Sequence, residues 1–375
     1  MTQQARTVTL GVVIVVILGL VFYFESQKPR RVVTEGSEIQ APTTAIKKQE
    51  KSKRYLLAKE ITTPDGFINA GKISISEFIG KKVVLIDFWT YSCINCQRTI
   101  PYLNAWYEKY KDKGFVIIGV HTPEFEFEKK YENVLAAVKK FDIKYPVVLD
   151  NDFSTWNAYG NRYWPRKYLI DIDGFIVYDH IGEGAYEETE QKIQELLEER
   201  LAALGSQEEI NQKIGVPRDI SEVSFRQIGS PEIYFGASRN EYLGNGESGK
   251  TGTQTLEQPS SIDLNTLYIV GDWDFDPEFA ENKSSNAKII FRYKSKDVYF
   301  VASASESIKI KVLRDGKPFE TKFKGADITI SDGESFGTVK EDRLYTIIED
   351  QTYGEHTLEI IIENPGLKAF TFTFG

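Results

Sequence analysis

Residues 83–101 read VVLIDFWTYSCINCQRTIP, and the interpretation of the chain starts from this segment. It opens with Val83–Ile86, an apolar and largely β-branched run that is typical of a buried strand. The motif Cys93-Ile94-Asn95-Cys96 follows where a helical pattern begins. Two cysteines at a strand-to-helix turn indicate redox chemistry, because unpaired N–H groups and the helix dipole at a helix N-terminus favour a thiolate.

The spacing of the two cysteines predicts a different role for each thiol. Cys93 is expected at the exposed start of the helix, where it would be the nucleophile that attacks a disulfide. Cys96 lies one turn further in and would resolve the mixed disulfide. We therefore expect a redox-active disulfide, Cys93–Cys96, and no other cofactor.

A CxxC motif also occurs in zinc sites and in structural disulfides. Zinc needs further thiolate or imidazole ligands. The chain has no other cysteine, and its three histidines, His121, His180 and His356, are scattered, so no metal site is predicted. A structural bridge is not favoured either, because it would close a very small loop and restrain the unfolded chain little.

The stretch resembles the thioredoxin superfamily, since Asp87-Phe88-Trp89 and Pro101 flank the motif at the offsets found in thioredoxins. The longer segment 87–106, DFWTYSCINCQRTIPYLNAW, together with NAYGNRYWP at 157–165, is similar to the soluble part of DipZ-type thiol:disulfide interchange proteins. It is also similar to redoxins of the TlpA and AhpC/TSA type. This resemblance implies an α/β thioredoxin-like domain, a mixed central sheet flanked by helices, which we place at residues 55–204.

The resemblance also implies further site residues. Asp87 would lie buried beneath the motif and relay the proton of Cys96, the alternative being a purely structural carboxylate. Pro165 precedes the strand KYLID where thioredoxin-like domains carry a cis-proline facing the dithiol. We expect a cis bond here, rather than an ordinary trans proline, with backbone groups open to an extended substrate.

Residues around the motif are candidates for tuning and substrate binding. Glu124 follows the second predicted strand, where reductases of the cytochrome-maturation type carry a glutamate near the dithiol, and it would tune the thiol pKa. His121 is expected to be a polar strand-end residue rather than a catalytic partner. Aromatic side chains would line a substrate groove or, alternatively, pack in the core: Trp89, Tyr91, Trp156 and Trp164.

Periodicity predicts the elements around the motif. A helix runs from the motif to Gly114. A hairpin is expected within 55–80, from the turn signals TPDG and NAG. The remaining predicted elements are strands at 115–120 and 147–149, helices at 127–141 and 186–204, and a hairpin of 167–171 with 175–180.

The N-terminal region predicts a membrane anchor. After a short tail, residues 1–7, the 17 residues of 8–24 carry no charge and form a candidate transmembrane helix. A cleaved signal peptide is the alternative, but no small-x-small site follows. The basic residues of 25–54, a predicted flexible tether, would favour a cytoplasmic soluble part. The family resemblance implies an extracytoplasmic one, which we follow.

The C-terminal part has a different composition. Residues 205–230, interrupted by Pro217, are a predicted linker. From 231 to 375, short alternating runs are separated by turn signals such as Asp315-Gly316 and Asp332-Gly333, which predicts a jelly-roll-like antiparallel β-sandwich. It resembles the domain that follows thioredoxin in DipZ-type proteins. A glycan or protein ligand is the functional interpretation, and a spacer role the alternative.

Together these features predict a membrane-anchored thiol:disulfide oxidoreductase that acts on protein dithiols and disulfides, in the reductase direction. A separate membrane or soluble donor would supply electrons, because the chain has one candidate span where DipZ has a multi-helix domain. A net charge of −9 argues against nucleic acid. One alternative is a thiol peroxidase using Cys93, with Thr90 placed as in peroxiredoxins but Ile86 replacing their proline. Another is a cell-surface glycan-binding or scaffold protein.

Overall fold

A computed structural model describes residues 44–217 and 223–375. The predicted anchor, residues 8–24, and residues 25–43 of the predicted tether lie outside the described residues. None of the helices in the described ranges is long and apolar enough to cross a bilayer. The chain divides into two units, 1–47 and 48–375, and the following concerns the second.

The first half of this unit is built on a six-stranded sheet with the order β1-β4-β3-β2-β5-β6. Its strands are β1 (Gly66–Ile68), β2 (Val83–Trp89), β3 (Phe115–His121), β4 (Val147–Leu149), β5 (Arg166–Ile170) and β6 (Ile176–Ile181). The central strands β2, β3 and β4 are parallel, while β1, β5 and β6 pair antiparallel with their neighbours. The predicted mixed sheet is therefore confirmed.

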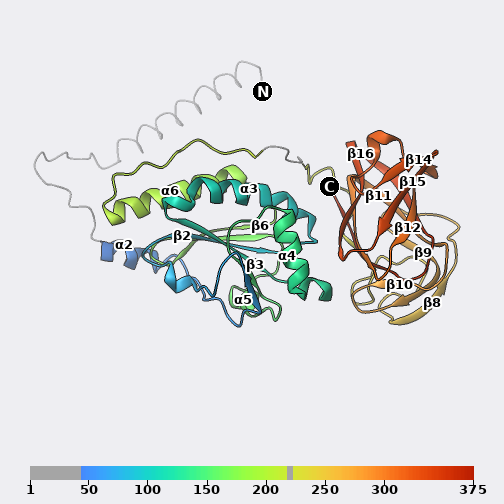
Figure 1. Ribbon diagram of the computed structural model, residues 1–375, viewed down its shortest axis with the longest axis horizontal. Helices are drawn as coiled ribbons and strands as arrows, with labels where there is room; N and C mark the ends of the chain where they lie inside the picture. The colour runs from blue at the N-terminus through green and yellow to red at the C-terminus, as the bar shows by residue number, and fades with distance from the viewer. Residues whose placement is uncertain (1–43, 218–222) are drawn as a thin grey trace, which may run out of the picture. The chain divides into compact units, whose positions relative to one another are not determined.

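Helices cover both faces of this sheet, and every residue of β2 and β3 is accordingly buried. The helices of the described chain are α2 (Thr44–Lys51), α3 (Ile94–Tyr110), α4 (Tyr131–Lys140), α5 (Ser154–Ala158) and α6 (Tyr186–Leu204), with 3-10 turns η1 (Ile75–Glu77), η2 (Lys111–Lys113) and η3 (Glu126–Lys129) in the same half. Figure 1 shows α3 and α6 on one side of the sheet and α5 on the other. We call β1 to α6 the α/β domain.

The alternation of side chains along β2 explains the two layers. Val83 and Leu85 join an apolar cluster with α3, α4 and α6, whereas Val84 and Ile86 join a second cluster with α5. The strand thus contributes to both cores and ends at Trp89, shortly before Cys93, so the CxxC motif lies at the carboxyl-terminal end of a central strand.

Two local predictions need correction. The predicted hairpin within 55–80 is absent from the structure: β1 pairs with β4, and Leu57 forms a bridge with Phe175. Pairing with β4 covers an edge that would otherwise be open. The predicted helix at 127–141 begins only at Tyr131, after the 3-10 turn η3.

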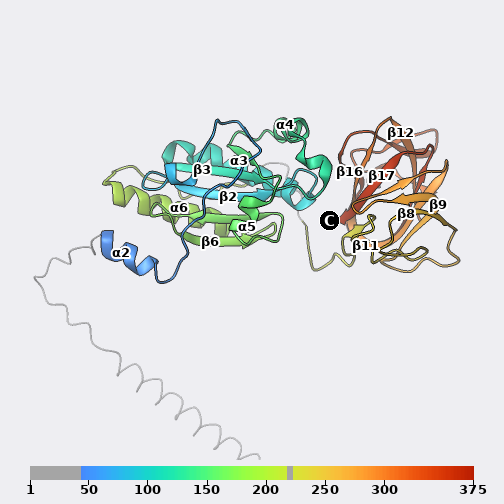
Figure 2. The ribbon, with the colours of Figure 1, turned by 90° about the horizontal axis from the view of Figure 1, so that it is seen from below.

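The second half, the β domain, contains eleven strands. They are β7 (Ile233–Tyr234), β8 (Gly252–Leu256), β9 (Leu267–Phe275), β10 (Ala280–Asn282), β11 (Ala287–Ala304), β12 (Ile308–Arg314), β13 (Lys317–Pro318), β14 (Thr329–Ser331), β15 (Glu334–Val339), β16 (Arg343–Ile362) and β17 (Leu367–Phe374), with one 3-10 turn, η4 (Thr321–Phe323) (Figure 2). All strand pairs of this sheet are antiparallel.

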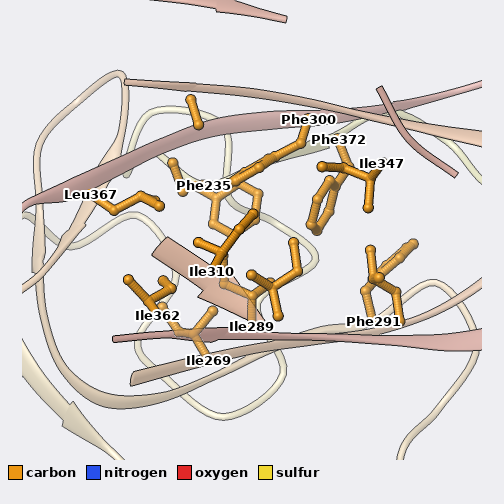
Figure 3. Close-up of a cluster of buried hydrophobic side chains, with 14 of the residues drawn as sticks. Phe235, Ile269, Ile289, Phe291, Phe300, Ile310, Ile347, Ile362, Leu367 and Phe372 are labelled. Carbon is orange, nitrogen blue, oxygen red and sulfur yellow. The ribbon is translucent and has the colours of Figure 1, made fainter. Parts of the chain in front are cut away.

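The β domain closes around one apolar core. The longest pair, β11 with β16, shifts register at Ser295/Asp297 and at Val298/Tyr299, and such bulges bend strands. Because β11 also pairs with β9 and β17, the sheet continues around the core. Figure 3 shows the core side chains, including Phe235, Phe300 and Phe372, between strands on two sides.

Candidate functional site

The two cysteines lie at the start of α3, shortly after the end of β2. Cys93 is the N-cap of α3, and its Sγ accepts a hydrogen bond of 3.2 Å from the backbone N–H of Cys96. Cys93 is half-buried and Cys96 is buried, and both are free thiols. The first cysteine is therefore accessible to a substrate, while the second faces the first from inside the domain.

Beneath the dithiol lies a buried polar group, Asp87. It is 1% exposed, and its Oδ1 has no hydrogen-bond partner in the described part of the chain. Burial raises the pKa of Asp87 to about 7, partly opposed by the positive charge of Lys167. Burial also raises the pKa of Cys96, and the adjacent Cys93 adds to this rise. Asp87 is thus a buried carboxyl group beneath the dithiol whose pKa is near neutral pH.

Lys167 is a site residue that the sequence analysis missed. It is fully buried and lies directly opposite Asp87 in the antiparallel pairing of β2 with β5. Its Nζ donates a hydrogen bond of 3.1 Å to the carbonyl of Gly182. Burial lowers its pKa, and Asp87 and Cys96 counteract this. A lysine inside an otherwise apolar strand, KYLI, was the available signal.

The loop before β5 completes the surroundings of the dithiol. The Trp164–Pro165 peptide bond is cis, as expected from the sequence. Pro165 is buried, and its carbonyl accepts a hydrogen bond of 2.8 Å from the Gly182 N–H. This carbonyl therefore already accepts a hydrogen bond within the domain.

Comparisons with known proteins agree with this geometry. Residues 58–197 match the Redoxin family, and residues 230–375 match the family described as thioredoxin like C-terminal domain. Protein DipZ of Mycobacterium tuberculosis (strain CDC 1551 / Oshkosh) is 36% identical over 296 residues, which are 78% of this chain and 39% of DipZ. Thiol-disulfide oxidoreductase ResA of Bacillus cereus (strain ATCC 10987 / NRS 248) is 34% identical over 125 residues, 33% of this chain and 69% of ResA.

This chain belongs to the thioredoxin superfamily. It spans only 39% of the length of the DipZ proteins that it matches. Among solved structures, a putative thiol:disulfide interchange protein DsbE from Chlorobium tepidum aligns with 38% of this chain and 96% of its own chain, at 27% identity and a TM-score of 0.34.

Within this thioredoxin-superfamily domain, Glu128 is a second residue that the sequence analysis missed. It is fully buried in η3, and its carboxylate accepts hydrogen bonds from the N–H and Oγ of Ser92, at 3.2 and 2.6 Å, and from the N–H groups of Glu124 and Phe125, at 2.6 and 3.1 Å. Burial raises its pKa to about 6, opposed by the hydrogen bond from Ser92. Glu128 thus ties the residue before Cys93 to the loop after β3.

Glu124, the predicted tuning residue, lies in the same loop but turns toward the β domain. Its Oε1 accepts hydrogen bonds from the Tyr234 hydroxyl at 2.9 Å and from Arg239 Nη1 at 2.7 Å. No hydrogen bond or ion pair joins it to Cys93 or Cys96 within residues 44–217 and 223–375. The sequence could not indicate this contact, because the partners are more than 100 residues away.

The predicted groove aromatics occupy different environments. Trp89 is buried, so the alternative of core packing describes it. Tyr91 stacks on the fully buried His121, with ring centroids 5.8 Å apart, and its hydroxyl donates to the Asp342 carbonyl at 3.0 Å. Trp164 is half-buried, and its Nε1 donates to the Thr122 carbonyl at 3.0 Å.

His121 and Trp156 belong to the packed interior. His121 ends β3, and burial lowers its pKa to about 3, so it is neutral at physiological pH. Trp156 is buried, with its ring centroid 4.3 Å from that of Trp164. Of the four aromatics, Trp164 is half-buried, whereas Trp89, Tyr91 and Trp156 are buried.

Residues of the β domain contribute to the same apolar cluster as Cys96. The Phe370 ring lies 5.1 Å from that of Phe125 and 4.8 Å from that of Phe127, measured between centroids. The Arg98 guanidinium, one turn after Cys93, lies 5.8 Å from the ring of Tyr299. The surroundings of the dithiol are therefore built by both halves of the chain.

Proposed function

We propose that this protein is a membrane-anchored thiol:disulfide oxidoreductase that exchanges protein dithiols and disulfides through Cys93 and Cys96. One observation carries the proposal: an accessible thiol at a helix N-cap faces a buried thiol one turn further along. The relationship to ResA, whose name describes a thiol-disulfide oxidoreductase, supports it. No cofactor beyond the Cys93–Cys96 disulfide is required.

The reaction follows from this placement. The Cys93 thiolate attacks one sulfur of a substrate disulfide, and the other substrate sulfur leaves as a thiolate that takes a proton from solvent. Cys96 then loses its proton to Asp87 and attacks Cys93 Sγ. The Cys93–Cys96 bond forms, the bond to the substrate breaks, and the substrate leaves as a dithiol. Two electrons have moved from the protein to the substrate.

Further assignments complete the proposal. Trp164 would contact an extended substrate beside Cys93, and the buried Pro165 and Tyr91 would shape the surface beneath it. Glu124 would act on the dithiol indirectly, through the loop that Glu128 holds. A separate membrane or soluble donor would re-reduce the disulfide. The uncharged run 8–24 would anchor the chain in the membrane, with its soluble domains on the extracytoplasmic side. The β domain would bind a glycan or a protein.

Trapping tests the mechanism directly. With a protein disulfide as substrate, Cys96→Ser is expected to accumulate a mixed disulfide through Cys93, visible on non-reducing gels and removed by dithiothreitol. Cys93→Ser is expected to trap none, because Cys96 is buried. Equal trapping by both variants, or none by either, would reject this mechanism. Peroxide consumption by the wild type with no disulfide exchange would favour a peroxidase.

The direction of electron flow is set by the reduction potential of the pair. Equilibration of the full chain with glutathione and dithiothreitol buffers measures it. We expect a value near that of thioredoxin, about −270 mV, which suits a reductase. A value near −120 mV, as in strong oxidants of folding proteins, would reverse the proposed direction.

A further inference from the structure

A cleft opens between the α/β domain and the β domain beside the dithiol. Its volume is about 920 Å³, at the upper end of the range of ~300–1,000 Å³ that is usual for ligand sites. Tyr91 and Gln97, which flank the CxxC motif, form part of its wall, and Gln97 Nε2 donates a hydrogen bond of 2.8 Å to the Tyr91 carbonyl. A ligand in this cleft would therefore lie next to the segment that carries Cys93 and Cys96.

The β-domain wall of the cleft continues the sheet face that packs against the α/β domain. Tyr299 and Val301 of β11 belong to the apolar cluster that contains Cys96. Because side chains alternate along a strand, Ser303 lies on the same face, and the register sets it opposite Lys368 of β17. Ser303 is 5% exposed, and its hydroxyl makes no hydrogen bond within the described residues. This face thus changes from apolar to polar where the cleft lies.

The cleft is basic, although the whole chain has a net charge of −9. Five basic and three acidic side chains line it. Each acidic side chain is already paired: Glu281 with Lys283 at 2.8 Å, Glu341 with Arg343 at 2.9 Å and Asp342 with Lys130 at 3.0 Å. These carboxylates are therefore not available to the other basic side chains of the cleft.

Three lysines of the cleft have no carboxylate partner. Lys140 at the end of α4, Lys340 before β16 and Lys368 of β17 form no ion pair within residues 44–217 and 223–375. The ammonium of Lys140 lies 5.5 Å from the centre of the Phe141 ring, and that of Lys368 lies 4.6 Å from the centre of the Phe279 ring. Neither ring carries a formal negative charge, so the cleft presents three positive charges from both domains.

We propose that the cleft binds an acidic, extended segment of the protein substrate, next to the disulfide that Cys93 attacks. This rests on the proposed function and names the class of its substrate. The three lysines lie on α4, on β17 and in the turn between β15 and β16, so a segment with several carboxylates can pair with more of them than one small anion can. Ser303 adds a hydroxyl donor beside Lys368. Binding in the cleft involves no covalent step.

Binding of a cysteine-free peptide tests the proposal apart from disulfide exchange. The probe is a fluorescein-labelled peptide of alternating Glu and Gly, and its matched control has Gln in place of Glu. Fluorescence anisotropy with the full chain is expected to show binding of the Glu peptide that weakens as salt is added. The Gln peptide is expected to bind at least ~10-fold more weakly. Equal binding of the two peptides would overturn the proposal.

Substitution of the lysines locates the site. A cleft variant with Lys140→Gln, Lys340→Gln and Lys368→Gln is expected to bind the Glu peptide about 10-fold more weakly than the wild type. Should the half-buried Lys368 be needed for folding, Lys140→Gln with Lys340→Gln changes only exposed side chains and is expected to give an intermediate loss.

A matched control variant removes the same amount of charge outside the cleft. It carries Lys59→Gln, Lys72→Gln and Lys317→Gln, at exposed lysines that do not line the cleft. At about 0.15 M salt, where charge effects over longer distances are largely screened, its affinity is expected to stay within about 2-fold of the wild type. Equal losses in the cleft variant and the control variant would overturn the proposal. Binding of alginate, a carboxylate polysaccharide, in preference to the Glu peptide would also overturn it.

Exchange kinetics separate this inference from the proposed function. Two peptide disulfides with the same cysteines, one flanked by Glu and the other by Gln, serve as substrates. The Glu-flanked disulfide is expected to have a KM about 10-fold lower, and the cleft variant is expected to lose this difference. Exchange with equal KM for both would overturn the inference and keep the proposed function. No exchange with either disulfide, with the Glu peptide still bound through the three lysines, would reject the proposed function and keep the cleft as a site for acidic peptides.

Discussion

At the scale of single residues, Glu128 shows how a buried carboxylate holds a reactive loop in place. Four hydrogen bonds converge on it from Ser92, Glu124 and Phe125. Because its pKa is raised from 4.5 to about 6, the folded state binds its proton more tightly than the unfolded state. Its contribution to stability is therefore complete below about pH 4.5 and is lost as the pH rises through about 6.

Glu128→Gln should remove this pH dependence. Between pH 4 and 7 the wild type is expected to lose up to ~2 kcal/mol of unfolding free energy through this group. The variant should lose that much less over the same interval. At pH 7, where Glu128 is ionised, the variant should be less stable by about 1–3 kcal/mol, because an amide cannot accept all four bonds that the carboxylate accepts. Urea unfolding at several pH values measures both effects, and parallel pH curves for the two proteins would contradict the assignment.

Gly119 gives a second residue-scale prediction. It lies in β3 beside the site, and a Cβ there would be 3.0 Å from Trp89 Nε1 and 3.1 Å from Tyr145 Cε2. Gly119→Ala is therefore expected to lower the unfolding free energy by about 1–3 kcal/mol through overpacking. Gly71→Ala is the matched control, because no atom of the described residues lies within 4 Å of where its new Cβ would be. Equal stabilities of the two variants would show that the site relaxes freely.

The sequence predicted the candidate site residues that lie in short motifs. It missed those that only strand pairing or a folded loop brings to the site. Cys93, Cys96, Asp87 and Pro165 all lie in short motifs at fixed offsets, so no tertiary information was needed. Lys167 becomes a site residue only because the register of β2 with β5 sets it against Asp87. Glu128 does so only because η3 folds back onto Ser92, which no periodicity predicts.

At the scale of elements, strands and helices with strong periodicity matched the sequence predictions, and those that depend on distant partners did not. Strand β4 and helix α6 have the predicted bounds, 147–149 and 186–204. The segment 55–80 was misjudged because β1 finds its partner some 80 residues away, where turn signals carry no information. The helix α4 begins late because η3 turns Phe127 toward Phe370.

The turn between β5 and β6 carries a prediction of its own. Gly174 has φ of +92°, and a Cβ there would lie 3.2 Å from Ile79 Cδ1. Asp171 supports the turn by accepting hydrogen bonds from the N–H groups of Asp173 and Phe175. Gly174→Ala is expected to cost about 1–3 kcal/mol in urea unfolding. Asn tolerates positive φ better, so a Gly174→Asn loss larger than that of Ala would argue against a backbone origin.

At the scale of the whole unit 48–375, the α/β and β domains share contacts beside the dithiol. Glu124 accepts hydrogen bonds from Tyr234 and Arg239, and the Arg239 guanidinium lies 3.7 Å from the centre of the Tyr234 ring. The side chain of Glu124 is 14% exposed and that of Arg239 is 40% exposed. Solvent therefore screens part of this ion pair.

A double-mutant cycle measures the contribution of this contact. Glu124→Gln and Arg239→Met, singly and together in the full chain, are expected to give a coupling of about 0.5–1.5 kcal/mol in urea unfolding. The control cycle uses Lys192 and Glu195, an exposed pair on α6 with a 2.6 Å contact, for which about 0–0.5 kcal/mol is expected. A coupling no larger than the control would mean that Glu124 and Arg239 do not join the domains energetically.

Phe370 has a consequence for how such chains diverge. Its ring sits among Phe125 and Phe127, in the loop that Glu128 anchors next to the dithiol. A β domain taken from another relative would have to present an equivalent ring at the same place, or leave Phe125 and Phe127 without their neighbour. The two domains are therefore not freely interchangeable modules, and substitutions at these three positions should be inherited together.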